Sequence, residues 1–158
     1  MMYGSIVWTY CSKEDLMRVF RSQKRAARVI LGTGIRSRTV ENFKKLNWIP
    51  FFDEVKIRKC VLIYKALHGE SPTYIESTLT TNHSLHGRET RHGQYNLICP
   101  KYRNTTEAGR SFQVSSIKLW NSLPNELRKQ RSISSLRNDL KNYFINSYRD
   151  IDSFEAVL

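Results

Sequence analysis

The chain has 158 residues, a length that favours one domain able to bury most of its apolar surface without disulfide or metal cross-links. Hydrophobic residues make up 40% and charged residues 25% of the chain, which excludes a wholly disordered protein. Lys and Arg number 26 against 14 acidic residues, and the charge of +12 favours a polyanionic partner over a neutral small molecule.

The first predicted helix has the most regular pattern in the sequence. Ser12 is placed to cap it, Glu14 and Asp15 complement its positive end, and Gly32 and Gly34 end it. One side is mainly apolar and consists of Leu16, Val19, Phe20, Gln23, Ala27, Ile30 and Leu31. The opposite arc, roughly 120° wide, carries the cations Arg18, Arg21, Lys24, Arg25 and Arg28.

Three further helices are predicted before residue 80. One runs from Thr39 through Leu46, with Val40, Phe43 and Leu46 facing inward. The next runs from about Pro50 to Leu67 and is closed by Gly69. Its main apolar stripe is Ile57, Cys60, Val61, Tyr64 and Leu67, and a second line holds Val55 and Leu62. Two apolar sides predict a helix at the centre of its bundle. A short helix begins at Pro72, capped by Ser71.

The second half of the chain begins with a polar surface loop at residues 80–96, followed by a short extended piece at Leu97–Cys99. A helix is predicted from Ala108 to Leu123, and Ser122 is placed to cap a further turn. The last helix starts near residues 132–135 and is expected to bury Ile133, Leu136, Leu140, Tyr143 and Phe144.

Together these elements predict a mainly α fold, an irregular bundle of about six or seven helices with at most one short extended segment. We divide the chain into a first segment with the basic helix (1–34), a helical hairpin region (35–79), the polar loop (80–96), a C-terminal helical region (97–148) and a frayed tail (149–158).

The cysteine content and the N-terminal sequence predict an intracellular protein that is not secreted. Cys11, Cys60 and Cys99 are odd in number and far apart, which favours a reducing compartment. The opening residues 1–8 lack a basic region of the signal-peptide type, and no apolar run reaches the length of a membrane span. Cys11 and Cys60 lie among apolar residues and are expected to fill the core.

Motifs for catalysis are missing from the sequence. Two-metal chemistry needs clustered carboxylates, and no two of the five aspartates are adjacent. Asp53 and Glu54 fall at a predicted helix start, where they compensate the helix dipole. No phosphate-binding glycine loop or nucleophile elbow occurs, so we expect no enzymatic activity and no cofactor.

The basic helix is the strongest candidate site. Its five cations have no acidic residue among them, and phosphate backbones favour such a row because each contact releases condensed counterions. The sequence therefore predicts that this face binds RNA or DNA backbone. Later cations that would extend the track are Arg88, Arg91, Lys101, Arg103 and Arg110.

Four stretches in order make the chain similar to a known family. They are residues 3–8 with 23–30; Leu46-Asn47-Trp48-Ile49-Pro50 with 62–69 and 72–75; Phe112 through Leu119-Trp120-Asn121-Ser122-Leu123-Pro124; and residues 132–144. This order resembles the C-terminal part of reverse transcriptases of non-LTR, jockey-like (LINE-like) retrotransposons. The resemblance covers about residues 3–145. Within it we expect Trp8, Trp48, Pro50, Trp120 and Pro124 to be structural anchors.

The resemblance implies that residues 1–34 correspond to the end of the polymerase thumb, which grips the template-primer duplex. It also implies that the rest of the chain is a helical scaffold behind the thumb. In the family, catalysis belongs to palm aspartates and a separate endonuclease domain, and neither has a counterpart here. We therefore expect a non-catalytic fragment whose partners are nucleic-acid backbone and, in an intact parent, the upstream palm. A nuclear or cytoplasmic location follows from that parent.

Two alternatives stay open at this stage. The first is a domesticated helical adaptor whose basic helix docks an acidic protein. The second is a small zinc-dependent module built on His83, His86, His92 and Cys99, although these residues lack the close cysteine pair of a zinc knuckle.

Overall fold

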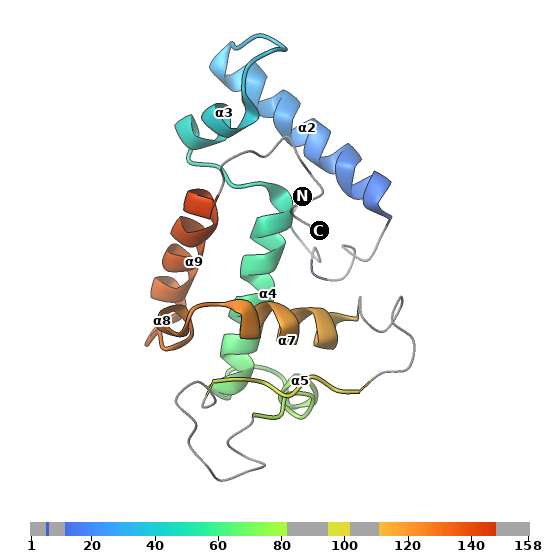
Figure 1. The fold of residues 1–158 in the computed structure, drawn as a ribbon, viewed down its shortest axis with the longest axis vertical. Coiled ribbons are helices and arrows are strands. Elements are labelled where there is room, and N and C mark those ends of the chain that lie inside the picture. Colours follow the sequence, from blue (N-terminus) through green and yellow to red (C-terminus); the bar gives the residue numbers. More distant parts are fainter. Residues whose placement is uncertain (1–5, 7–11, 82–94, 102–110, 148–158) are drawn as a thin grey trace.

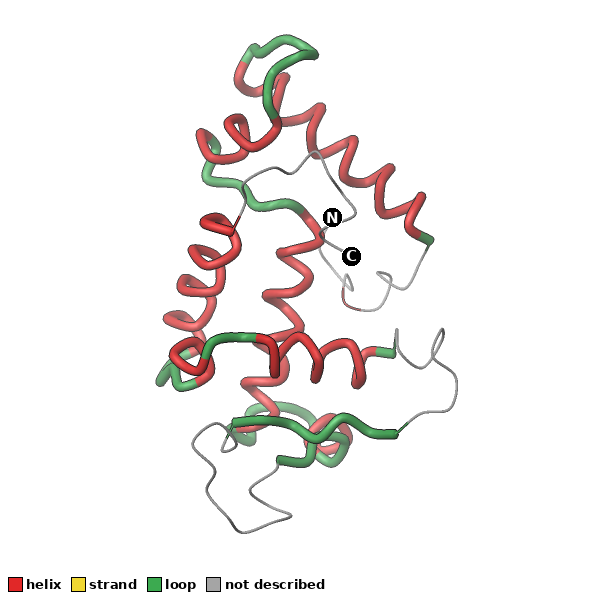
Figure 2. The backbone as a smooth tube through the Cα atoms, in the orientation of Figure 1, coloured by secondary structure: helices red, strands yellow, loops and turns green. Residues whose placement is uncertain are grey.

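The computed structural model describes residue 6 and residues 12–81, 95–101 and 111–147 of the chain, and these ranges contain seven helices (Figure 1). The helices are α2 (Lys13–Leu31), α3 (Thr39–Lys45), α4 (Phe51–Leu67), α5 (Thr73–Glu76), α7 (Phe112–Ser122), α8 (Asn125–Arg128) and α9 (Ile133–Ser147). Helix is the dominant structure along the described trace (Figure 2). The predicted mainly α bundle is confirmed.

Helix α4 runs along the long axis and joins two apolar cores (Figure 1). Its first turns pack with α2 and α3 and form with them the first core. In this core the centroid of the Phe20 ring lies 6.1 Å from that of Phe43 and 5.1 Å from that of Phe52. The remaining turns of α4 pack with α7 and α9 and form the second core. The second core contains Ile57, Cys60, Tyr64, Ile117, Trp120, Leu136 and Leu140. The prediction of a central helix buried on two sides is confirmed.

Helix α2 begins and ends where the sequence predicts. The Ser12 hydroxyl accepts a hydrogen bond from the Asp15 amide at 3.2 Å, and Gly32 closes the helix in the left-handed region with φ of 61°. Ile30 lies on the mainly apolar side of the helix, yet this side chain is 59% exposed. The reason is positional, because the last turn of α2 extends to the tip of the molecule, beyond α4 (Figure 1).

Three predictions are wrong: two serines do not cap the helices assigned to them, and one residue expected in the core is exposed. Pro72 precedes α5 without a side-chain cap, and the Ser71 amide instead donates to Glu76 Oε1 at 3.3 Å. Ser122 belongs to α7 and donates to the Leu119 carbonyl, while Pro124 precedes α8. Tyr143 is 40% exposed because successive residues of α9 point about 100° apart and Phe144 takes the buried position.

Within residues 95–101 the predicted extended piece, Leu97–Cys99, pairs with the rest of the described chain at one isolated bridge. Thr81 and Leu97 form an isolated antiparallel bridge. The Asn121 side chain accepts from the Leu97 amide at 2.9 Å and donates to its carbonyl at 2.8 Å. The start predicted for the following helix, at residues 108–110, lies outside the described ranges; the described helix α7 is capped by the Ser111 hydroxyl.

A glutamine on the apolar side of α2 fixes the connection between α3 and α4. Gln23 Nε2 donates to the Ile49 carbonyl at 2.8 Å, and its Oε1 accepts from the Phe51 amide at 2.9 Å. Phe51 is the first residue of α4, so its amide has no partner within the helix. Gln23 therefore supplies the polar contacts that an apolar residue at this position would leave unmade.

Replacing Gln23 with Ala is expected to lower the free energy of unfolding by about 1–3 kcal/mol, because two partly buried backbone groups lose their partners. Urea unfolding followed by far-UV circular dichroism measures the change. The neighbouring, exposed Ser22→Ala variant is the control and should stay within about 0.5 kcal/mol of wild type. Equal effects of the two substitutions would contradict this role of Gln23.

Candidate nucleic-acid interface

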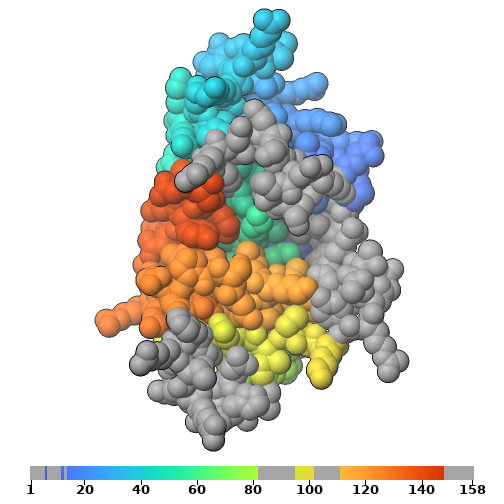
Figure 3. All heavy atoms as spheres, viewed as in Figure 1, coloured from blue at the N-terminus to red at the C-terminus, as the bar shows by residue number. Residues whose placement is uncertain are grey.

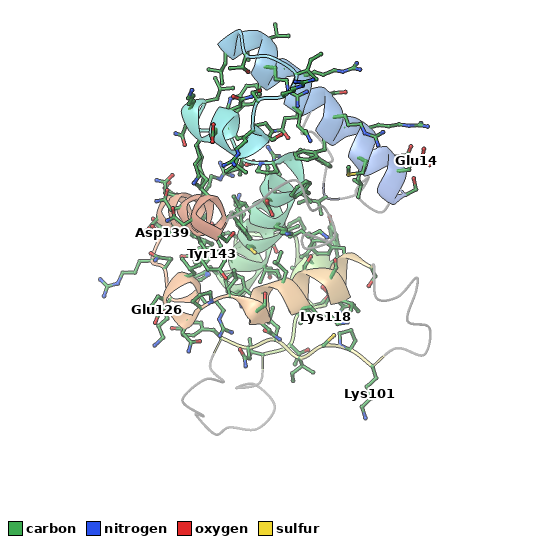
Figure 4. The ribbon with its side chains drawn as sticks, turned by 45° about the horizontal axis from the view of Figure 1, so that its top comes forward. Glu14, Lys101, Lys118, Glu126, Asp139 and Tyr143 are labelled. Atoms are coloured by element: carbon green, nitrogen blue, oxygen red, sulfur yellow. The ribbon has the colours of Figure 1, made fainter. Side chains whose placement is uncertain are left out.

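The cations predicted on α2 lie along one side of the helix, away from its packed face. Arg21 and Arg25 are exposed, and Lys24 and Arg28 are half-buried. Lys24 Nζ lies 5.3 Å from the centroid of the Phe20 ring, so its stem follows the edge of the first core. Nitrogen-tipped side chains extend outward from α2 in Figure 4. This arrangement leaves a cationic helix face open to a large anionic partner.

Arg18 differs from the other four cations because it is paired with acidic side chains. Its guanidinium lies 3.7 Å from Glu14 and 3.5 Å from Asp15, and all three side chains are at least half exposed. Both acids sit one turn before Arg18, the spacing at which helix side chains meet. The helical spacing alone makes the five cations look equivalent, but in the structure the first of them is paired with two carboxylates.

Helix α3 and the turn before it bring further cations to the same end of the molecule, which the sequence interpretation did not include. Arg36, Arg38, Lys44 and Lys45 are exposed, and Arg38 pairs with Glu41 at 3.8 Å. Residues 12–48 hold ten of the 26 Lys and Arg residues but only three acidic ones. A local count of charge would have identified this region, which forms the blue to cyan end of the space-filling view (Figure 3).

The structure does not bring the other predicted cations to this face. Lys101 is exposed on the segment at residues 95–101, at the end of the molecule opposite α2 and α3 (Figures 1 and 4). Arg88, Arg91, Arg103 and Arg110 lie outside the described residues. The cationic surface seen in the structure therefore consists of the cations of α2, of α3 and of their connection. Its extension to the cations after residue 87 stays a prediction.

Four of the five residues predicted as anchors lie in the described ranges. Trp120 is fully buried and its Nε1 donates to the Tyr95 carbonyl at 2.9 Å. Trp48 is half-buried against Phe43, with 6.3 Å between ring centroids. Pro50 and Pro124 precede α4 and α8. Trp8 lies outside the described residues.

The zinc alternative cannot be assembled from described residues. His83, His86 and His92 lie outside them, and Cys99 is a half-buried free thiol. Within the described ranges no three His, Cys, Asp or Glu side chains gather as metal ligands would. Cys60 is completely buried as predicted, and burial raises the pKa of its thiol to about 12, so it stays neutral. In the same ranges no helix combines the length and apolar character needed to cross a bilayer.

Two ionisable side chains of α4, Lys59 and Asp53, have shifted pKa values because they are buried in the packed bundle. Lys59 donates to the Ser115 hydroxyl at 3.0 Å and so ties α4 to α7, and burial lowers the pKa of its ammonium. Asp53 is 1% exposed, its Oδ1 lies 3.0 Å from Lys56 Nζ, and its Oδ2 has no hydrogen-bond partner among the residues that the structure describes. Burial raises the pKa of this carboxyl above its ordinary value, and Lys56 opposes the rise.

Compared with family models, with curated proteins and with solved structures, the chain matches none of them.

The raised pKa of Asp53 predicts a pH dependence of stability. The folded state holds the proton more tightly than the unfolded state, so this group makes the free energy of unfolding fall as pH rises above about 4. Asp53→Asn removes that contribution. The stability of the variant relative to wild type should therefore increase between about pH 4 and pH 7 in urea unfolding. A constant difference, or one that decreases with pH, would refute the assignment.

The pairing of Arg18 predicts unequal roles for two exposed arginines of α2. Arg25→Gln should weaken binding of a labelled 20-nucleotide RNA and reduce the salt slope of log K by roughly 0.7–0.9. Arg18→Gln should change the slope by less than half as much, because Glu14 and Asp15 already neutralise this guanidinium. Fluorescence anisotropy at several salt concentrations measures both slopes. A larger effect of Arg18→Gln would count against the pairing.

Proposed function

We propose that the chain binds RNA or DNA backbone through the cationic face of α2, without strong dependence on base sequence and without catalytic activity of its own. The observation that carries this proposal is the row of Arg21 and Arg25, which are exposed, and Arg28, which is half-buried, on a helix whose other side is packed into the first core. Phosphates spaced along a nucleic-acid strand match such a row of side chains.

The charge balance around α2 supports a polyanion over a small anionic ligand. The excess of ten cations over three acids in residues 12–48 extends over α2, α3 and their connection. The acids in this region are each close to a cation, since Glu14 and Asp15 face Arg18 and Glu41 faces Arg38. Arg21, Arg25 and Arg28 have no ion-pair partner among the described residues. A surface of this extent suits an elongated anion.

The resemblance to retrotransposon reverse transcriptases supports the same role. In that family the thumb grips a template-primer duplex, and the stretch that resembles the thumb end includes α2. The proposal assigns no polymerase or nuclease chemistry to the chain. It concerns backbone binding alone, and it leaves the choice between RNA and DNA to experiment.

The salt dependence of binding tests this proposal. Affinity for a 20-nucleotide RNA and a 20-base-pair DNA should fall steeply with salt in wild type. A variant with Arg21→Gln, Arg25→Gln and Arg28→Gln should reduce the slope of log K against log salt by roughly 2–3, since each lost phosphate contact removes about 0.7–0.9. Far-UV circular dichroism confirms that the variant stays folded.

The matched control removes the same charge from parts of the molecule outside α2 and α3. Lys101 is exposed at the opposite end, Lys129 and Arg131 are exposed on the connection between α8 and α9, and replacing all three with Gln should leave most of the slope in place. Equal loss in both triple variants would show a diffuse charge effect and contradict binding by α2. If wild type shows no salt-dependent binding of nucleic acid but does bind polyglutamate, the result would favour the adaptor alternative.

A further inference from the structure

A groove follows α4 between α2 and α9. A cavity of about 660 Å³ is lined by residues of α2, of the α3–α4 connection, of α4 and of α9, including the apolar side chains Val19, Ala26, Trp48, Ile49, Phe51 and Ile57. A second cavity of about 300 Å³ continues along α4 to Val61 and Ile133. The two share Arg137 and Asn138, so they form one surface along the helix.

The rim of this groove is positively charged. Arg137 and Lys141 line the first cavity, and Lys65 lines the second. None of these three cations has an ion-pair partner among the described residues. Glu54, the carboxylate in the lining, is already bound to Arg58 at 3.1 Å. The groove therefore matches a segment that combines apolar anchors with free carboxylates.

The chain itself contains such a segment directly after α9. Residues 149–158 read RDIDSFEAVL and lie outside the described residues. Among their apolar residues, Ile151, Phe154 and Leu158 follow the i, i+3, i+7 spacing by which groove-binding segments present anchors. The carboxylates of Asp150, Asp152 and Glu155 alternate with these anchors.

The described end of α9 lies close to the groove along the helix. Helix α9 ends at Ser147, six residues after Lys141, which corresponds to about 9 Å along the helix axis. Ten further residues span up to about 33 Å when extended, more than is needed to return to the groove. Because both ends belong to one chain, the effective concentration of the segment at the groove is high.

We propose that residues 149–158 dock in the groove between α2, α4 and α9, with Ile151, Phe154 and Leu158 on its apolar floor and the carboxylates beside Arg137 and Lys141. This inference does not depend on the proposed nucleic-acid binding. It concerns a different face of α2, the side of Val19 and Ala26.

Site-specific photo-crosslinking tests the docking in the full chain. Phe154 is replaced by p-benzoyl-phenylalanine, the protein is irradiated at low micromolar concentration, and the products are mapped by mass spectrometry. The proposal predicts crosslinks within one chain to groove residues such as Trp48 and Ile57. Crosslinks to other parts of the surface, crosslinks between two chains, or no crosslinks would each overturn it.

Charge reversal provides the matched control. Arg137→Glu with Lys141→Glu should reduce the groove crosslinks at least about fivefold, and adding Asp150→Lys with Asp152→Lys should restore them. Reversal of two cations away from the groove, Lys129→Glu with Arg131→Glu, should leave the yield unchanged. Far-UV circular dichroism checks folding of each variant. A groove crosslink that does not respond to the first pair, or responds equally to both pairs, would contradict the charge matching.

Discussion

The burial of α4 on two sides is the constraint on which the rest of the structure depends. Its first turns complete a core with α2 and α3, and its later turns complete another with α7 and α9. Neither group of helices covers its apolar residues without α4. The polar residues of α4 accordingly carry contacts between helices, as Lys59 does with Ser115.

This packing determines which side of α2 is free. Leu16, Phe20 and Ala27 are buried by α3 and α4, and Gln23 is committed to the chain entering α4. The cations on the opposite side are therefore left to face outward, and their stems gain packing at the edge of the core, as Lys24 does on Phe20. The apolar side of α2 thus forms part of the first core, and its burial leaves the opposite, cationic side as the candidate interface.

The parts of the fold and the site that the sequence predicts are those set by neighbouring residues, such as helix caps and apolar periodicity. The ends of α2 follow from Ser12 and Gly32, and the central place of α4 follows from its two apolar lines. The exposure of Ile30 depends on how far the covering helices extend, and helical periodicity does not contain that information. For the site, the sequence located the cations of α2. It missed those of α3 and could not place Lys101 at the opposite end, since both depend on tertiary arrangement.

The most direct measurement of the central idea is the response of individual arginine side chains to a nucleic acid. Titration of uniformly ¹⁵N-labelled protein with a 20-nucleotide RNA, observed at the arginine Nε–Hε resonances, reports which guanidinium groups meet phosphate. The account predicts the largest shifts at Arg21, Arg25 and Arg28, with smaller shifts at Arg18. Shifts concentrated at Arg131 and Arg137, or no shifts during saturable binding, would contradict it.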